Sequence, residues 1–405
     1  IRQKHLLLMM NVSRKIVNNG IMLIFLCALI FIMNAGVAAA YTLSSCGTIS
    51  SPGNYALTSD LTSSTSCITI ASSNVVLDGR DPTTGMKHTI AAGGDAVYIN
   101  APQSSNNNIL IKNIISSSGL SNFYANPGNG ITVEGSDIGS VSIWRSDDLT
   151  IKNSKLRGLS IRSNDYCPDS DPPLRAKIIN NTIIGSSEVL VYLQATDCSL
   201  IIDTNHVIEN NTIINNYPSP TYPTGVPVTV YMIRGVANNI IKNNTIISPN
   251  AIPLYLRDGA DRNTFDRNYV ETNVGGNRGA LFFGSGGPYP SMPSNNIFRN
   301  NTFVGRNSGG IITQGWGAGN VFDNNVFWGN RQGTTYGSNF ITSGTGGGHI
   351  FRHNTFYNSD NSQAALVMGG SSGNPNTFTG NIFASASSAA ISCEFSSGIN
   401  IYSGN

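Results

Sequence analysis

The sequence predicts an all-β fold, a parallel β-helix of roughly ten to twelve coils with an N-terminal cap. Three observations support it. A motif of the form apolar-x-Asn-Asn-Thr-apolar recurs between Ile178 and Phe383, once in each stretch of chain that could form one coil. β-branched residues, Asn and Gly dominate between the copies, without the helical periodicity of the α-helical repeat classes. Charged residues make up only 11% of the chain, against roughly 25% in an average soluble protein.

Residues 1–40 have the pattern of a secretory signal peptide. A basic stretch precedes an apolar run over residues 21–33, and three alanines before Tyr41 offer a small-residue cleavage site. Because the sequence starts with Ile, we expect upstream read-through before a start at Met9 or Met10. The leader predicts an extracellular protein. No second apolar stretch is long enough to span a bilayer, so we expect no membrane span after leader removal.

The charge balance excludes one class of function. Removal of the leader leaves 20 basic residues against 22 acidic ones. A protein with this balance is not an electrostatically driven nucleic-acid binder. A surface so poor in charge also has little protection against association with copies of itself.

Residues 41–100 lack the repeat and are expected to form the cap and first coils, whereas residues 101–405 form the repeating coils. Each full copy of the motif contains one Asn that aligns with the others. These anchors are Asn181, Asn211, Asn244, Asn268, Asn301, Asn325, Asn354 and Asn381. Asn tolerates the left-handed backbone of a sharp turn, which a short connection between two coil strands needs.

Counting from the anchors predicts which side chains stack on successive coils. The residues three before and two after each anchor are all apolar, and both rows change from aliphatic to aromatic along the chain. We expect these two rows to line the core. Two residues before the anchor the strand faces outward, and there six charges alternate in sign: Glu209, Lys242, Asp266, Arg299, Asp323 and Arg352. Stacking at about 4.8 Å would make each neighbouring pair attractive.

The N-terminal segment has its own signature, with Cys46-Gly-Thr-Ile followed by Cys67-Ile-Thr-Ile and Val75-Val-Leu-Asp-Gly. Together with the Asn-Asn-Thr-Ile coils, it resembles the secreted right-handed β-helix proteins of the NosD and pectate-lyase-like superfamily, most closely those that archaea place on the cell surface. The resemblance covers nearly all of the chain after the leader. It implies a right-handed solenoid but no single function, since this scaffold hosts lyases, hydrolases, epimerases, adhesins and shell subunits.

The best candidate for a catalytic site is a cluster around Arg257-Asp258-Gly-Ala-Asp261-Arg262. Arg234 and Asp258 stand at the same distance before successive anchors, Asn244 and Asn268, so they could stack on successive coils. Arg234, Asp258 and Asp261 are therefore the candidate catalytic residues, and an ordinary ion pair between coils is the alternative. The carboxylate pattern of galacturonase-type relatives is not found. The sequence thus favours a protein that is not an enzyme and that needs neither cofactor nor metal.

Five cysteines remain after leader removal, and a secreted protein permits disulfides. Cys46 and Cys67 flank one strand and turn of the cap and form a natural pair. Cys167 and Cys198 stand at nearly the same distance before successive anchors, Asn181 and Asn211, which places them within bridging reach. Cys393 is left over and is a candidate for an intermolecular bond, with a buried thiol as the alternative.

Four glycosylation sequons occur at the position just before the anchor: Asn180, Asn210, Asn243 and Asn300. Either they carry glycans or they serve an internal Asn ladder.

Low charge, an exposed terminal coil edge and a spare Cys together favour a structural cell-envelope protein. We expect a subunit that assembles with copies of itself into an extracellular sheath or surface layer, of the kind expected in methanogenic archaea, with disulfide cross-links. The alternative is a secreted carbohydrate-active enzyme or polysaccharide-binding β-helix that uses the face of Arg234, Asp258 and Asp261. A shallow groove lined by those residues with exposed Tyr or Trp would favour this alternative.

Overall fold

The computed structural model describes most of the chain after the leader. The described residues are 40–101, 107–122, 130–144, 146–162, 175–195, 202–218, 227–275, 278–284, 292–313, 317–329, 339–343, 347–359, 364–371, 375–385, 390–393 and 401–404. The chain divides into two compact units, Ile1–Tyr41 and Thr42–Asn405. Within the described ranges, no helix is long and apolar enough to cross a membrane.

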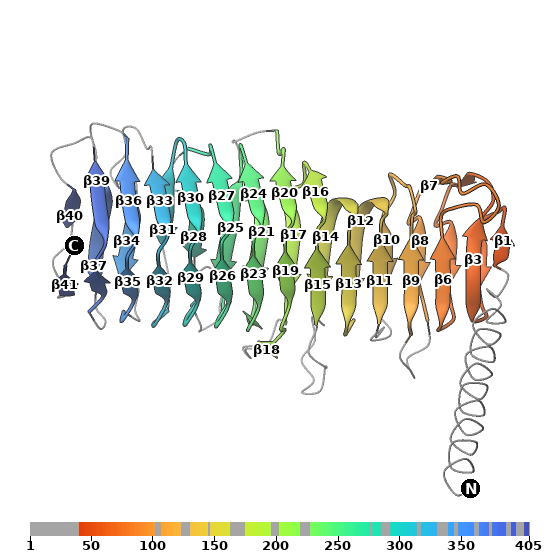
Figure 1. Ribbon diagram of the computed structural model, residues 1–405, viewed down its shortest axis with the longest axis horizontal. Helices are drawn as coiled ribbons and strands as arrows, with labels where there is room; N and C mark the ends of the chain where they lie inside the picture. Colours follow the sequence, from red (N-terminus) through yellow and green to blue (C-terminus); the bar gives the residue numbers. More distant parts are fainter. Residues whose placement is uncertain are drawn as a thin grey trace, which may run out of the picture. The chain divides into compact units, whose positions relative to one another are not determined.

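One long sheet, sheet 1, runs through the second unit, and its pairings from β3 onward are parallel (Figure 1). Its strands in order are β1 (Tyr41–Leu43), β3 (Gly53–Leu57), β6 (Val75–Asp78), β9 (Ile109–Lys112), β11 (Ile131–Glu134), β13 (Leu149–Lys152), β15 (Ala176–Ile179), β19 (Val207–Glu209), β23 (Ile240–Lys242), β26 (Thr264–Asp266), β29 (Ile297–Arg299), β32 (Val321–Asp323), β35 (Ile350–Arg352), β38 (Thr377–Thr379) and β41 (Ile401–Ser403). Each coil contributes one strand.

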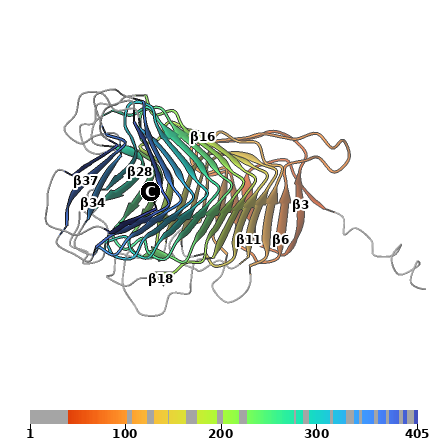
Figure 2. The same ribbon diagram turned by 60° about the vertical axis from the view of Figure 1, so that its left-hand side comes forward.

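A second parallel sheet begins beside it and divides into two rows after β14 (Figure 2). Its undivided part contains β2 (Gly47–Ile49), β5 (Ile68–Ile70), β8 (Val97–Ile99), β10 (Leu120–Asn122), β12 (Asp137–Trp144) and β14 (Lys155–Arg162). We call the first of the two rows sheet 2. It continues as β16 (Thr182–Gly185), β20 (Thr212–Asn215), β24 (Thr245–Ser248), β27 (Tyr269–Thr272), β30 (Thr302–Gly305), β33 (Val326–Gly329), β36 (Thr355–Asn358) and β39 (Ile382–Ser385). We call the other row sheet 3. It continues as β17 (Val189–Gln194), β21 (Val228–Ile233), β25 (Ile252–Arg257), β28 (Gly279–Gly284), β31 (Gly309–Thr313), β34 (Phe340–Ser343), β37 (Leu366–Ser371) and β40 (Ile391–Cys393).

Each later coil therefore has three strands, one in each sheet. The predicted parallel β-helix is confirmed, but the fifteen strands of sheet 1 show more coils than the ten to twelve expected. Two small sheets complete the unit, β4 (Leu61–Ser63) with β7 (Ile90–Ala92) and β18 (Ile202–Asp203) with β22 (Val236–Ala237).

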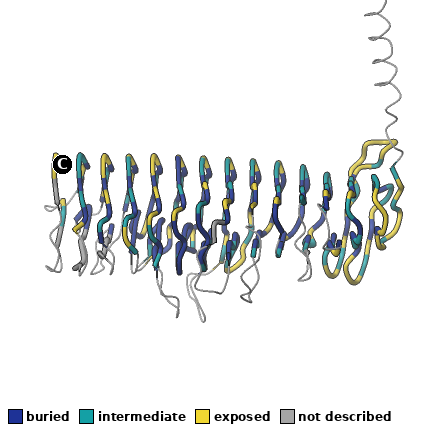
Figure 3. Tube along the Cα trace, turned by 90° about the horizontal axis from the view of Figure 1, so that it is seen from below, coloured by how far each residue is buried: buried dark blue, intermediate teal, exposed yellow. Residues whose placement is uncertain are grey.

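The core contains the two rows that the sequence predicts together with residues of sheet 3 such as Leu193 and Met232, and buried segments recur along the coils (Figure 3). The aromatic half of the first row is a stack of nearly parallel rings, for example Phe298 on Phe322 at 4.9 Å and Phe322 on Phe351 at 4.7 Å between ring centroids. In the second row Phe303 stacks on Phe327 at 5.2 Å. Ring stacking on the later coils helps to fix the register of one coil on the next.

In the turn between sheets 1 and 2, the anchor and the residue before it differ in backbone conformation and in burial. The residue before the anchor has a left-handed backbone and is exposed at all four sequons, Asn180, Asn210, Asn243 and Asn300, with φ of 55 to 58°. The anchors themselves are buried and form a ladder. Asn244, for example, accepts hydrogen bonds at its Oδ1 from the backbone and side chain of Asn211 and donates from Nδ2 to Asn268. The internal Asn ladder thus lies one residue after the sequons.

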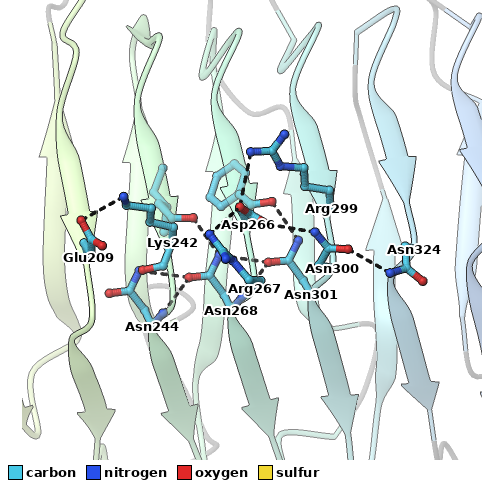
Figure 4. Close-up of polar contacts among 12 residues, drawn as sticks. Glu209, Lys242, Asn244, Asp266, Arg267, Asn268, Arg299, Asn300, Asn301 and Asn324 are labelled. Carbon is cyan, nitrogen blue, oxygen red and sulfur yellow. Dashed lines mark hydrogen bonds and ion pairs between the residues drawn. The ribbon is translucent and has the colours of Figure 1, made fainter.

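The alternating charges lie in one outward row of sheet 1, because the strands pair residue for residue in that register (Figure 4). Each acid forms an ion pair with the base on the next coil: Glu209 with Lys242 at 3.1 Å, Asp266 with Arg299 at 3.3 Å and Asp323 with Arg352 at 2.9 Å. The row also extends to earlier coils, where Asp78 pairs with Lys112 at 3.1 Å and Glu134 with Lys152 at 3.2 Å.

The first coils contain a disulfide between Cys46 and Cys67, whose Cα atoms lie 4.7 Å apart. Cys167 and Cys198 lie outside the described residues. Only the backbone of Cys393 is described, in β40 opposite Met368 of β37.

Candidate functional site

Aromatic side chains line the outer face of sheet 3 on four successive coils. Alternation along the strands buries Leu193, Met232, Leu256 and Phe283 in the core and turns the preceding residues outward. These are Tyr192, Tyr231, Tyr255 and Phe282, which pair in register across the sheet. The rings of Tyr231 and Tyr255 stack with their centroids 5.1 Å apart, and Tyr192 and Phe282 meet them edge-on at 5.7 and 5.0 Å. We call this row the ring row.

Two guanidinium groups flank the ring row. Arg162, on β14, places its Cζ 4.4 Å from the ring centroid of Tyr192 and 5.1 Å from that of Trp144. Arg257, at the end of β25, donates from Nη1 to the hydroxyl of Tyr231 at 3.1 Å and pairs with Asp258 at 3.0 Å. The outer face therefore presents ring edges, phenol groups and cations side by side, while Phe282 itself is buried, at 7% exposed.

Burial changes the pKa values of the tyrosines on this face. It raises the pKa of Tyr231 to about 12, against the opposing effect of the Arg257 charge, and it raises the pKa of Tyr255 as well. Both phenols are therefore protonated at neutral pH and are able to donate a hydrogen bond or a proton.

A cavity of about 330 Å³ opens at the N-terminal end of the ring row. Small side chains of β12 and β14, among them Ser140, Ser142 and Ser160, form one side, and Arg162 and Tyr192 form another. The cavity is thus continuous with the outer face that bears the rings.

The candidate catalytic residues lie at the end of this face, in the turns that follow the strands. Arg234 and Asp258 both have left-handed backbones, and the amide of Gly235 donates to the carbonyl of Asp258, so these two positions stack on successive coils. The side chain of Asp258 is only 4% exposed. The carboxylate of Asp261 accepts a hydrogen bond from the amide of Ser294 at 2.7 Å and is also nearly buried. The carboxylates of Asp258 and Asp261 are therefore buried within the turns and have protein partners there.

The sequence-based reasoning missed the rings, and a signal for them existed. Tyr231 and Tyr255 stand at the same distance before their anchors, Asn244 and Asn268, and each interrupts an apolar run. Tyr192 stands farther from its own anchor, Asn211, so the shared spacing does not include it.

Asp261 gives a testable pH dependence. Burial raises its pKa to about 6, whereas the unfolded chain keeps the ordinary value of 3.8. The folded state thus holds the proton more tightly, and this group lowers stability as the pH rises from about 4 to about 6. We expect Asp261→Asn, which retains an acceptor for Ser294, to unfold with a free energy roughly 1–3 kcal/mol higher at pH 7.5 and unchanged at pH 4. Urea denaturation at both pH values measures the difference, and a less stable variant at pH 7.5 would contradict the assignment.

Among the described residues, no cluster of three or more His, Cys, Asp or Glu side chains is arranged to hold a metal ion.

Comparison with known proteins agrees with the fold. Residues 232–405 match the family described as right handed beta helix region. No curated protein shows significant similarity to the chain. Among solved structures, the Azotobacter vinelandii mannuronan C-5 epimerase AlgE6 A-module is 12% identical over 87% of this chain and 89% of its own, with a TM-score of 0.46.

Two further structures have similar values. The Dettilon tailspike protein is 12% identical over 88% of this chain and 61% of its own, with a TM-score of 0.40. A PL6 alginate lyase in complex with a trisaccharide is 14% identical over 87% of this chain and 82% of its own, with a TM-score of 0.36. At such identities and TM-scores these likenesses support no conclusion about this chain. The described chain thus folds as a parallel β-helix, and its residues 232–405 match the family of right-handed beta helix regions.

Proposed function

We propose that this protein is an extracellular carbohydrate-active β-helix that binds a polysaccharide along the ring row of sheet 3. One observation carries the proposal: tyrosine rings repeat on consecutive coils with guanidinium groups beside them. Coils are spaced by about 4.8 Å, which is close to the length of one sugar unit. Successive rings can therefore meet successive sugars of one chain.

The chemistry of the face suits such a ligand. Phenol and guanidinium groups hydrogen-bond to hydroxyl or carboxylate oxygens, and the ring edges between them offer apolar contact to a sugar. Tyr231 and Arg257 lie together on this face, with Nη1 of Arg257 3.1 Å from the phenol oxygen, so the two groups can contact one sugar. This pair favours a lyase or epimerase type of chemistry over hydrolysis, which uses two accessible carboxylates.

The experiment that tests the proposal is affinity electrophoresis of the folded protein in gels containing polygalacturonate, alginate or dextran. We expect retardation in at least one gel, and ultraviolet absorbance or chain-length analysis then shows whether the bound polymer is changed. Unretarded migration in all three gels, with the protein folded by circular dichroism, would contradict polysaccharide binding for these polymers and remove the main support for the proposal.

A second candidate function, the self-assembling envelope subunit, is favoured by a different face. The outer face of sheet 1 exposes Ile240, Ile297 and Ile350, which are 43%, 40% and 39% exposed. The charge row beside them is self-complementary. In an antiparallel pair of copies, Glu209 would face Arg352 and Lys242 would face Asp323. Such a contact would bury the isoleucines and oppose unlike charges.

Electrophoresis with and without reductant, together with negative-stain microscopy, tests this candidate. Ordered polymers that release the subunit only after reduction would support the envelope function and implicate Cys393. A monomer in both conditions would contradict it. This outcome does not depend on the polysaccharide assay, so the two functions are separable.

A further inference from the structure

We propose that the cavity at the N-terminal end of the ring row binds the oxyanion of a charged sugar, a carboxylate or a sulfate ester, with Arg162 as its principal ligand. This inference rests on the proposed function and deepens it, because it assigns the charge of the ligand and the place where that charge is recognised.

The cavity exists because the strands beneath it carry small residues. Gly158 lies on β14 between Ser140 and Leu190, and a Cβ at this position would come within 3.0 Å of Ser140 Oγ. Ser140, Ser142 and Ser160 surround it on the outer face. A volume of about 330 Å³ is at the lower end of the range of ligand pockets, which suits a single sugar.

Aromatic rings and a hydroxyl hold Arg162 in place. Its guanidinium lies against the rings of both Trp144 and Tyr192, and its Nε donates to Ser160 Oγ at 2.9 Å. Among the residues that the structure describes, no carboxylate lies within ion-pair distance of Arg162. By contrast, Arg257 and Arg299 are paired with acids. A guanidinium that is fixed by rings rather than by an acid is suited to bind an oxyanion through two hydrogen bonds.

Two serine hydroxyls add to the donors. Ser142 Oγ accepts a hydrogen bond from Trp144 Nε1 at 3.2 Å, and Ser160 Oγ accepts from Arg162 Nε. Each hydroxyl therefore uses its oxygen as an acceptor and keeps its own hydrogen to donate. The polar groups beside the cavity are thus mainly donors, and a ligand that offers only acceptors, such as a carboxylate or a sulfate, matches them.

Isothermal titration calorimetry with monosaccharides tests the inference. The probes are galacturonate, N-acetylglucosamine 6-sulfate and, as the neutral control, galactose. We expect one or both anions to bind at least tenfold more tightly than galactose, and Arg162→Gln to lower that affinity at least tenfold. The two anions distinguish a carboxylate from a sulfate ester. Equal binding of galactose, no binding of either anion, or unchanged affinity in Arg162→Gln would overturn the inference.

Two further variants keep the result interpretable. Gly158→Val narrows the cavity from the side of Ser140 and is expected to weaken anion binding at least tenfold while the melting temperature shows a folded protein. Tyr255→Ala lies on the ring row outside the cavity and is expected to weaken polysaccharide binding but to leave monosaccharide binding unchanged.

If polysaccharide binding depends on Tyr255 while no monosaccharide anion binds, the cavity assignment fails and the proposed function stands. If anions bind but no polysaccharide does, the proposed function fails and the cavity assignment stands.

Discussion

Asn244→Ala is expected to lower the free energy of unfolding by about 3–5 kcal/mol. The Asn244 side chain accepts from the backbone and side chain of Asn211 and donates to the carbonyl of Ile208 and the side chain of Asn268. It is only 1% exposed, so water cannot replace these bonds. Each buried group left without its partner costs about 1–3 kcal/mol.

Its neighbour in the same turn provides the matched control. Asn243 is exposed and has φ of 55°, and Gly adopts this conformation without strain. We expect Asn243→Gly to change the stability by less than about 1 kcal/mol. Urea denaturation of both variants measures the contrast. Equal effects at the two positions would mean that the buried ladder does not hold the coils together.

The double variant Tyr231→Ala/Tyr255→Ala is expected to lower the affinity for whichever polysaccharide binds by about 100-fold or more. The two rings stack on each other at 5.1 Å and occupy the middle of the ring row, where central aromatic anchors usually contribute most to binding. Arg257 would also lose its hydrogen-bond partner on Tyr231. Affinity electrophoresis against the polysaccharide that retards the unaltered protein measures the loss.

An aromatic residue on another sheet controls for a general loss of surface rings. Tyr357, in sheet 2, is 39% exposed, and we expect Tyr357→Ala to bind as the unaltered protein does. Tyr231→Phe separates the ring from the hydroxyl: it should retain most of the affinity and lose any proton transfer. Retained affinity in the double variant would exclude the ring row as the binding face.

The coils could be predicted from the sequence because each copy repeats the same chemistry at the same distance from its anchor. The apolar rows and the charge row follow from alternation along a strand and from stacking, which act locally. The division of the later coils into three sheets could not be predicted, because the loops between sheets 2 and 3 vary in length and shift the count.

A second buried ladder shows the same limit. Asn239 donates to Asn263, Asn263 to Asn296 and Asn296 to Asn320. His206 and His349 continue this ladder at its two ends. The amide of Ala176 donates to Nδ1 of His206, and the amide of Asn320 donates to Nδ1 of His349. Burial lowers the pKa of both histidines to about 3, so they are neutral acceptors at neutral pH. The sequence interpretation found one ladder because only that one carries the Asn-Asn-Thr motif.

From the sequence we singled out the charged cluster and not the ring row, for a physical reason. Charged residues in sequence suggested Arg234, Asp258 and Asp261, yet a left-handed turn directs part of this segment toward the interior. The choice between an exposed carboxylate and one that a backbone amide satisfies depends on the next coil, here on Ser294. The ring row, by contrast, follows from strand alternation alone and could have been predicted from the sequence.

Hydroxyl-radical footprinting of the protein with and without bound polysaccharide tests the central claim most directly. Mass spectrometry reads the oxidation of each aromatic residue, and polygalacturonate or alginate is used according to the gel result. The account predicts protection of Trp144, Tyr192, Tyr231 and Tyr255, with Trp328 and Tyr357 on sheet 2 unchanged. Protection confined to Trp328 and Tyr357, or saturated binding without protection of any sheet 3 ring, would contradict it.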